Sequence, residues 1–364
     1  MTEVLLKELT NTDIDWMIAT GHQREIAAGS VLIEAGKPTN FLHILLDGIL
    51  SVTVSQPDDN PLTRALAAIE GGEILGREIA RLSSGEIVGE IPFVGTRSTA
   101  TTVKAVKKSL VMLIPQQELA AKLQQDVGFA SRFYRAISIL LSDRLQSIIN
   151  QVSRSNLAQG QPLRDVLFIL GELHDSDIDW MMACGTQQKI TANTTLIRER
   201  GTVDALYILL NGTMSLSIAE DERKPLARAF AAIEGNEIFG REIAKLSKGE
   251  IIGETPFIDG RLPSATVKAI EDSIVLSISR QQMAAKLQQD VGFASRFYRA
   301  IATLLSHRLQ GMLSQLGYGR RGYSKGLPLN ENVEYEDELT VSVLEHIALA
   351  GKRFDWMMGR LRVS

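Results

Sequence analysis

The stretch GEIVGEIPFVGTRSTATTV, residues 85–103, recurs as GEIIGETPFIDGRLPSATV at residues 249–267. Each copy joins a glycine-flanked acidic turn to a Pro-containing segment, then to an arginine and a run of small residues. Acidic residues favour a helix N-terminus, and proline is tolerated in a first helical turn. We therefore expect a short helix to begin at Glu90 and at Glu254. A helix N-terminus beside a guanidinium is a good site for a monoanion.

The repeat extends far beyond this stretch, because a shift of 164 residues lays one half of the chain on the other without a gap. The segment AAKLQQDVGFASRFYRAI, residues 120–137, recurs letter for letter at 284–301. The shift predicts two whole domains in tandem, residues 1–150 and 167–315, with residues 151–166 as the linker.

Within each copy the sequence predicts a short helix, many strands and a long helix. Asp13 suits a capped helix start, and VLIEAG, NFLHILLDGILSVTV and TTVKAVKKSLVMLI carry the β-branched and alternating apolar residues of strands. Asp47–Gly48 and Asn211–Gly212 predict hairpin turns. Residues 65–82 read as an enlarged hairpin or loop. Helical spacing of apolar residues predicts one long helix over 119–149. The fold class is therefore α+β, with two tandem β-rolls, jelly-roll-like, each flanked by an N-terminal helix and a long C-terminal helix.

The order of residues in 85–103 and 249–267 resembles the phosphate-binding cassette of the cyclic nucleotide-binding domain, the sensor of catabolite activator proteins and of the regulatory subunits of cAMP-dependent kinase. The resemblance implies that the glutamate accepts hydrogen bonds from a ribose 2′-hydroxyl, while backbone N–H groups and an arginine hold the cyclic phosphate. It places that arginine nine residues after the glutamate, where Thr99 and Pro263 stand. Arg97 and Arg261 come two residues earlier.

The candidate ligand-binding residues are the glycine, glutamate, arginine and small residues of each cassette. They are Gly89, Glu90, Arg97, Thr99, Ala100 and Thr101 in the first copy, and Gly253, Glu254, Arg261, Ser264 and Ala265 in the second. The alternatives are a carboxylate that caps a helix and an arginine on a surface loop. Losing a charge-assisted hydrogen bond costs about 1.5–3 kcal/mol, so a cyclic mononucleotide would bind weakly unless Arg97 substitutes. Arg77 and Arg241 are second candidates for contact with an anion.

Composition excludes several classes of function. A net charge of −4 gives no electrostatic reason to expect nucleic-acid binding, and no apolar run is long enough to span a membrane. We expect no signal peptide, since the N-terminus lacks a basic region followed by an apolar one. Cys184 is the only cysteine, which fits a cytoplasmic location. The five histidines show no zinc-ligand spacing, and catalytic motifs are absent from the sequence, so we expect no enzyme, metal or cofactor.

Residues 316–364 differ from both copies. GYGRRGYSKG reads as a flexible linker and NENVEYEDE as a solvated acidic run. LTVSVLEHIALAGKRFDWMMGRLRV predicts an amphipathic helix or a pair of helices. No helix-turn-helix pattern with a basic recognition helix follows either copy.

Two functions remain open. In the first, cAMP, cGMP or a related anion enters a roll, moves the long helices and changes contacts with a protein partner. In the second, the pockets have degenerated, and the domains act as an interaction or assembly module without nucleotide. The long helices could pack on their own rolls, pair the two copies, or join chains into a homo-oligomer.

Overall fold

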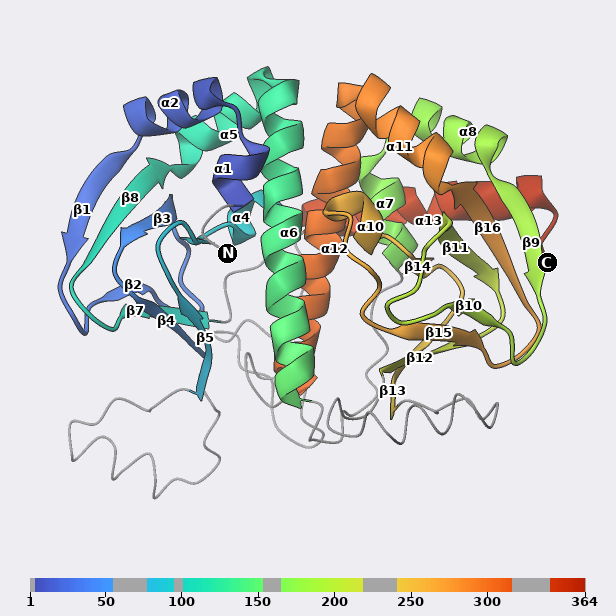
Figure 1. The fold of residues 1–364 in the computed structure, drawn as a ribbon. Coiled ribbons are helices and arrows are strands. Elements are labelled where there is room, and N and C mark those ends of the chain that lie inside the picture. The colour runs from blue at the N-terminus through green and yellow to red at the C-terminus, as the bar shows by residue number, and fades with distance from the viewer. Residues whose placement is uncertain are drawn as a thin grey trace. The chain divides into compact units, whose positions relative to one another are not determined.

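The computed structural model describes residues 4–54, 77–94, 101–152, 165–218, 241–315 and 341–363 (Figure 1). The chain divides into two compact units, residues 1–160 with 302–344 and residues 161–301 with 345–364. Each unit holds the roll of one repeat copy, so the repeated sequence folds twice into the same arrangement.

The first roll has helices before, within and after its strands. The helices are α1 (Val4–Glu8), α2 (Asn11–Thr20), α4 (Ile91–Val94), α5 (Gln116–Gln125) and α6 (Val127–Val152). The strands are β1 (His22–Ile26), β2 (Val31–Ile33), β3 (Phe41–Asp47), β4 (Leu50–Val54), β5 (Arg77–Leu82), β6 (Ile87–Val88), β7 (Thr101–Ala105) and β8 (Ser109–Pro115).

The strands of the first roll form two antiparallel sheets, β1-β8-β3-β6 and β2-β7-β4-β5. Apolar side chains of both sheets meet in the interior, where Leu45, Val52, Val88, Val103 and Val111 are buried together. Residues on one face of a strand alternate with those on the other, so this set fixes which face of each strand points inward. The predicted α+β class with jelly-roll-like rolls is confirmed.

The second roll repeats this order. Its helices are α7 (Asp165–Glu172), α8 (Asp175–Cys184), α10 (Thr255–Ile258), α11 (Arg280–Gln289) and α12 (Val291–Gln315). Its strands are β9 (Thr186–Ile190), β10 (Thr195–Ile197), β11 (Ala205–Asn211), β12 (Met214–Ile218), β13 (Arg241–Leu246), β14 (Ile251–Ile252), β15 (Thr266–Ala269) and β16 (Ser273–Ser279). They form the sheets β14-β11-β16-β9 and β10-β15-β12-β13.

The prediction of a hairpin at Asp47–Gly48 is wrong. Gly48 has the expected positive φ, 121°, but β3 and β4 lie in different sheets and do not pair. A Cβ at Gly48 would lie 2.1 Å from Oγ of Ser109, and Oγ of Ser109 accepts a hydrogen bond from the backbone N–H of Ile49. The glycine therefore marks the corner at which the chain crosses from one sheet to the other. Gly212, with φ of 95°, occupies the same corner between β11 and β12.

Part of the stretch 65–82 is a strand. Arg77–Leu82 forms β5 and pairs with β4 in antiparallel register, from Leu50 opposite Leu82 to Val54 opposite Arg77. The connection between the two strands, residues 55–76, lies outside the described residues.

The predicted single helix over 119–149 is two helices. α5 ends before Asp126, whose carboxylate accepts a hydrogen bond from the backbone N–H of Phe129 at 2.9 Å and so caps α6. Asp290 makes the same bond to Phe293 at 2.8 Å. A short acidic side chain that binds the backbone locally competes with continuation of the helix, which explains the break.

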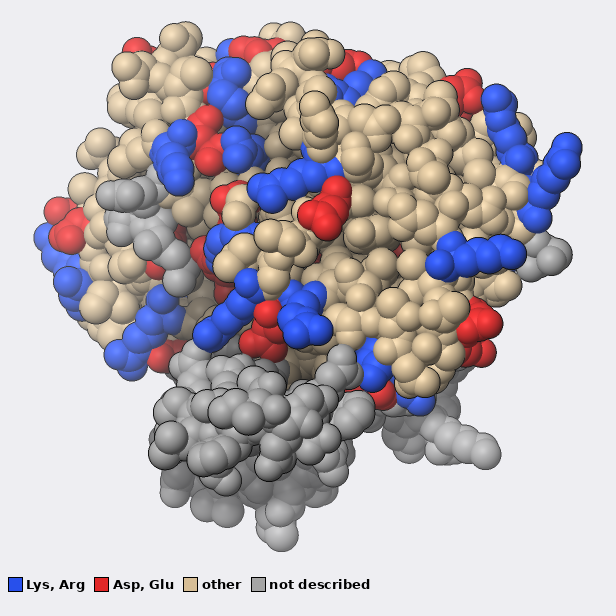
Figure 2. All heavy atoms as spheres, turned by 45° about the vertical axis from the view of Figure 1, so that its right-hand side comes forward, with Lys and Arg blue, Asp and Glu red and all other residues tan. Residues whose placement is uncertain are grey.

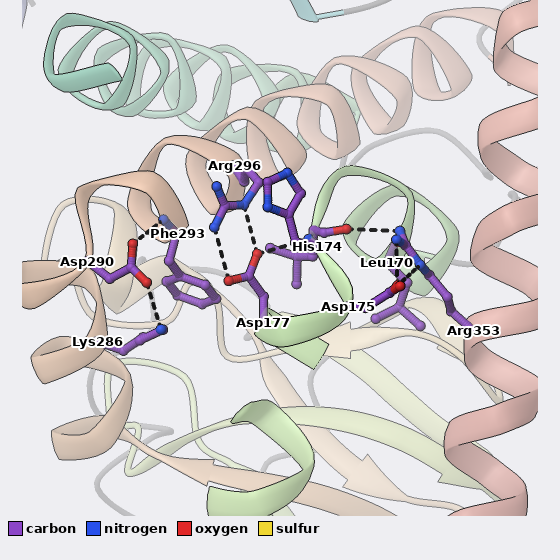
Figure 3. A network of polar contacts seen from close by, with 10 residues as sticks. Leu170, His174, Asp175, Asp177, Lys286, Asp290, Phe293, Arg296 and Arg353 are labelled. Atoms are coloured by element: carbon purple, nitrogen blue, oxygen red, sulfur yellow. Dashed lines mark hydrogen bonds and ion pairs between the residues drawn. The ribbon is translucent and has the colours of Figure 1, made fainter. Parts of the chain in front are cut away.

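The helix before each roll is tied to the long helix after it. Thr10 and Asp13 form a capping box at the start of α2, and Asp13 also pairs with Arg132 of α6 through two hydrogen bonds of 2.7 and 2.9 Å. Burial alone would raise the pKa of Asp13. The Arg132 guanidinium and the hydrogen bonds from Thr10 outweigh it and hold that pKa below its usual range. Asp177 and Arg296 form the equivalent pair in the second unit (Figure 3).

The tail ends in one helix, α13 (Val341–Leu361), whose residues from 345 onward belong to the compact unit of the second roll. Ala350, Phe354, Met357 and Met358 are buried at helical spacing. Arg353 donates to the carbonyl oxygens of Leu170 and Leu173 at the end of α7, at 2.6 and 2.9 Å, and pairs with Asp175 at the start of α8 (Figure 3). The sequence of the tail predicted either one amphipathic helix or a pair of helices, and the structure has one helix there.

The surface carries charges of both signs. On the face that Figure 2 shows, Lys and Arg side chains lie interspersed with Asp and Glu. No helix in the described part of the chain is both long and apolar enough to cross a membrane.

Candidate functional site

Each cassette contains a two-residue strand followed by a four-residue helix. β6 leads through Gly89 and Glu90 into α4, and β14 leads through Gly253 and Glu254 into α10. Gly89 has a φ of 86°, and a Cβ there would lie 2.6 Å from the carbonyl oxygen of Phe41. Only glycine accepts both the backbone conformation and the close approach. The expected short helices are present, each beginning directly after its glutamate.

The first glutamate of each cassette shapes the acidic turn. The side chain of Glu86 is buried and accepts hydrogen bonds from the backbone N–H and the hydroxyl of Ser83, at 2.6 and 3.0 Å. Glu250 accepts from the backbone N–H of Ser247 at 2.8 Å. These bonds occupy carboxylate oxygens within the turn itself. We therefore assign Glu86 and Glu250 to holding the turn that leads into the cassette.

The second glutamate of the first cassette lies against the long helix. Glu90 is 4% exposed, and its carboxylate pairs with the guanidinium of Arg144 from α6. The same guanidinium donates to the carbonyl oxygen of Ile87. A buried carboxylate is costly unless it is paired and hydrogen-bonded. Arg144, which lies on α6 and 54 residues after Glu90 in the sequence, supplies both the opposite charge and the hydrogen bond.

Apolar contacts join the same elements. The ring of Phe93 in α4 meets the ring of Phe133 in α6 edge to face, with centroids 6.2 Å apart. In the second unit, the hydroxyl of Tyr298 in α12 donates to the carbonyl oxygen of Phe257 in α10 at 3.2 Å. Each cassette helix is thus in direct contact with the long helix of its own copy.

The displaced arginine of the second cassette has an acidic partner close to it in the sequence. Arg261 pairs with Asp259, which lies two residues before it, and its side chain is 44% exposed. The backbone N–H of Arg261 also donates to Asp259 at 3.0 Å. In the first copy, Arg97, Thr99 and Ala100 lie outside the described residues.

The run of small residues leads into the next strand. Thr101 is the first residue of β7, while Ser264 is exposed and Ala265 is half-buried just before β15. Pro263, which stands where the family resemblance places the phosphate arginine, is buried, and its carbonyl oxygen accepts from the backbone N–H of Arg200 at 2.8 Å. That position in the second copy therefore serves the packing of the loop.

The second candidate arginines begin edge strands. Arg77 is the first residue of β5 and Arg241 the first of β13, and each strand stands at the end of its sheet. They pair with Val54 and Ile218 across the sheet.

A histidine of the first roll has an unsatisfied nitrogen. His43 on β3 is 6% exposed, its Nδ1 has no hydrogen-bond partner among the residues that the structure describes, and a Cβ at Gly89 would lie 3.2 Å from that atom. Burial lowers the pKa of His43 to about 4, although the backbone carbonyls of Val88 and Phe41 oppose the shift. The imidazole is therefore neutral at neutral pH. The equivalent residue of the second roll is Tyr207, part of the apolar interior.

The single cysteine of the chain lies at the end of α8. Burial raises the pKa of the Cys184 thiol, and a thiol that stays protonated is a poor nucleophile. Within the described ranges, no group of three or more His, Cys, Asp and Glu side chains is placed to hold a metal ion.

A family model for the cyclic nucleotide-binding domain matches residues 23–126 and again residues 187–290. The two matches together cover more than half of the chain. The chain belongs to the cyclic nucleotide-binding domain family. Each match begins on the first strand of a roll and ends at the aspartate that separates the last two helices.

Several solved structures are similar to the chain at low identity. The regulatory domain of Toxoplasma gondii PKA, crystallised with cAMP, is 16% identical, covers 79% of this chain and 89% of its own, and has a TM-score of 0.28. The regulatory subunit of a cAMP-independent protein kinase A from Trypanosoma cruzi, bound to guanosine, is 16% identical, with coverages of 79% and 82% and a TM-score of 0.27. The N-terminal domain of a transcriptional regulator from Streptomyces coelicolor A3(2) is 17% identical, with coverages of 43% and 94% and a TM-score of 0.30. No curated protein matches the chain.

Two residues at the first cyclic nucleotide-binding domain were missed by reasoning from the sequence. Arg144 carried a usable signal, because the 164-residue shift places Arg308 at the same position of the second copy. His43 differs between the copies instead of recurring. It is a polar residue at an inward position of its strand, and the matching position of the second copy holds Tyr207.

Proposed function

We propose that the chain is a regulatory, non-enzymatic protein whose tandem cyclic nucleotide-binding domains sense a cyclic nucleotide or a related anion, with cAMP and cGMP as the candidate ligands. The observation that carries this proposal is the contact between cassette and long helix. Glu90 pairs with Arg144, and Phe93 packs on Phe133. Membership of the family supports this class of ligand.

The contact supplies a route from ligand to response. A ligand that binds the cassette competes for, or adds to, the contacts that Glu90 makes with α6. A ligand shifts an equilibrium only by its differential affinity for two states, and here the states differ in how α6 lies on the cassette. The response is then a changed helix surface, which a protein partner or a second copy of the chain can recognise.

The proposed ligand contacts follow the cassette. Glu90 and Glu254 accept hydrogen bonds from ribose hydroxyls, and the backbone N–H groups of the small-residue runs donate to the phosphate. The residues in this assignment are Gly89, Glu90, Thr99, Ala100, Thr101, Gly253, Glu254, Ser264 and Ala265.

A thermal-shift experiment on the full chain tests the proposal. A ligand that binds only the folded state, at about a hundred times its Kd, adds roughly 2.7 kcal/mol of stability. For domains of this size that raises Tm by about 5–10 °C. Glu90→Gln combined with Glu254→Gln should markedly reduce the shift, measured against the variant's own ligand-free Tm. The control Glu34→Gln changes an exposed carboxylate of the first roll and should keep the shift.

Absence of a shift with 1 mM cAMP or cGMP would contradict the sensor proposal. The protein should first be denatured and its supernatant examined by ultraviolet absorbance, so that a ligand retained from expression is detected.

The assembly module remains the second candidate, and one observation favours it. Arg261 is engaged with Asp259, and Glu90 already has a cationic partner, so both groups are occupied without a nucleotide. This candidate predicts that mass by light scattering and partner capture are the same with and without nucleotide, and that Glu90→Gln with Glu254→Gln changes neither.

A further inference from the structure

The first cassette has a guanidinium beside its glutamate, but that guanidinium comes from the long helix. We infer that Arg144 of α6 is the group that binds the phosphate of a ligand in the first domain, in place of a cassette arginine. This inference rests on the proposed function and names the residue that would recognise the anion.

The contacts of Arg144 leave it able to bind a further acceptor. Its Nη1 donates to Glu90 and its Nη2 to the carbonyl oxygen of Ile87, and these are its only hydrogen bonds within the described residues. A guanidinium has five N–H groups in a fixed fork, and the described residues accept from two of them, which leaves three that a ligand can meet. The Arg144 side chain is 19% exposed, whereas that of Glu90 is 6% exposed. The accessible member of the pair is therefore the cation.

The helix delivers Arg144 to the cassette for a geometric reason. Arg144 follows Phe133 by eleven residues, which is about three turns of helix, so both side chains lie on the same face of α6. That face meets the cassette, since Phe133 contacts Phe93 of α4. The alternative cation of the second cassette, Arg261, is held by Asp259. Arg308 occupies the position of Arg144 on α12.

The chemistry defines the ligand. A hydroxyl pair that donates to Glu90 next to a monoanion that accepts from Arg144 describes a ribose carrying a cyclic phosphate. The carboxylate keeps the guanidinium oriented, and the spare N–H groups make charge-assisted bonds, the stronger class of hydrogen bond. Because Arg144 belongs to α6, the anion would act directly on the long helix.

Calorimetric titration of the full chain with cAMP and with adenosine tests this inference, because the two probes share the ribose and differ in the phosphate. The variant Arg144→Gln with Arg308→Gln should weaken binding of cAMP about 10- to 100-fold and leave binding of adenosine within about threefold. The matched control Arg97→Gln with Arg261→Gln should change neither affinity by more than about threefold.

Three outcomes would overturn the inference. Loss of cAMP binding in the control variant would return the phosphate to the cassette arginines. Equal weakening of cAMP and adenosine would show that Arg144 only positions Glu90. Failure of the unaltered chain to bind either probe would defeat the proposed function itself, and is recognised because it appears before any substitution.

A second variant covers loss of folding. Arg144→Gln alone leaves Glu90 buried without its cation, which could unfold the first domain. Arg144→Gln combined with Glu90→Gln removes both charges and lets the two amides hydrogen-bond. Compared with Glu90→Gln alone, this double variant should lose a further 10-fold or more in cAMP affinity and show no such loss for adenosine.

Discussion

The two domains share a frame and differ at two places. In each, a tryptophan of the helix before the roll meets a phenylalanine of the long helix with centroids 5.4 Å apart, Trp16 with Phe129 and Trp180 with Phe293. The paired Asp and Arg side chains also recur with matching distances. The repeated contacts are those that hold the long helix on its roll, so this attachment is what the duplication has preserved.

The first difference is at the corner between the two helices before each roll. In the second unit, Leu170 is fully buried, and a Cβ at Gly171 would lie 3.5 Å from the carbonyl oxygen of His346 in α13. The first copy has Leu6, which is 65% exposed, and Lys7 in place of the glycine. A lysine side chain would occupy the space that α13 fills. The glycine of the second copy thus lets α13 approach α7, whereas the lysine of the first copy would hinder such an approach.

The second difference lies inside the rolls. His43 and Tyr207 stand at equivalent positions on β3 and β11, both facing the interior. A neutral imidazole with an unsatisfied nitrogen is sensitive to acid, whereas a phenol in the same place is not. We therefore expect the two similar rolls to respond differently to acid.

The largest expected effect tests what the domains share. Arg132→Ala leaves the buried carboxylate of Asp13 without its cation, and Arg296→Ala does the same to Asp177. Removal of one partner of a buried pair costs about 3–5 kcal/mol, and we expect the two costs to agree within about 1 kcal/mol. Urea unfolding followed by the fluorescence of Trp16 or Trp180, with the other tryptophans changed to phenylalanine, measures each domain separately.

A cost below about 1 kcal/mol in either domain would show that the pair does not hold the long helix. The double variant Asp13→Asn with Arg132→Gln is the control, because it removes the buried charge together with its partner and should recover much of the loss.

The next effect separates the domains by pH. His43 is neutral in the folded state with a pKa of about 4, against about 6.5 in the unfolded chain. The unfolded state therefore binds more protons as pH falls from 6.5 to 4. The first domain should lose about 3 kcal/mol over that window, and the stability is fully present above pH 6.5.

Hydrogen exchange followed by mass spectrometry at several pH values, corrected for intrinsic exchange, compares β3 with β11 in one sample. His43→Tyr copies the second roll and should remove the additional loss in β3. Parallel acid profiles for the two strands in the unaltered chain would contradict the assignment.

Much of the architecture could be predicted from the sequence, because the repeat and the alternation of apolar residues report on the interior directly. Two local errors have different causes. Gly48 was interpreted as a hairpin because positive φ is shared by hairpins and by corners between sheets. The break at Asp126 was missed because apolar residues keep their helical spacing across it. At Gly48 the local sequence indicates the backbone conformation, but it does not determine which strands pair.

The site was predicted less well for a different reason. Reasoning from the cassette located Glu90 but not its partner, because Arg144 lies far away in sequence and reaches the cassette only through the packing of α6. The difference between Lys7 and Gly171 likewise had no meaning in the sequence alone, because Gly171 matters only where α13 lies against it. Contacts between residues far apart in the sequence can be predicted only once the fold is known.

The smallest expected effect concerns the contact that only the second unit has. Arg353→Ala removes the hydrogen bonds to Leu170 and Leu173 at the end of α7, together with the pair to Asp175. Hydrogen bonds from a charged donor contribute about 1.5–3 kcal/mol, so amide exchange in α13 should accelerate about 10- to 100-fold. Asp175→Asn is the matched control, because the first copy has Asn11 at this position and the Asp175 side chain is 84% exposed. It should accelerate exchange less than about fivefold, as expected for an exposed ion pair. Equal acceleration in both variants would place the anchoring of α13 in the ion pair, and no acceleration in either would show that the buried side chains of Phe354 and Met357 hold α13 without Arg353.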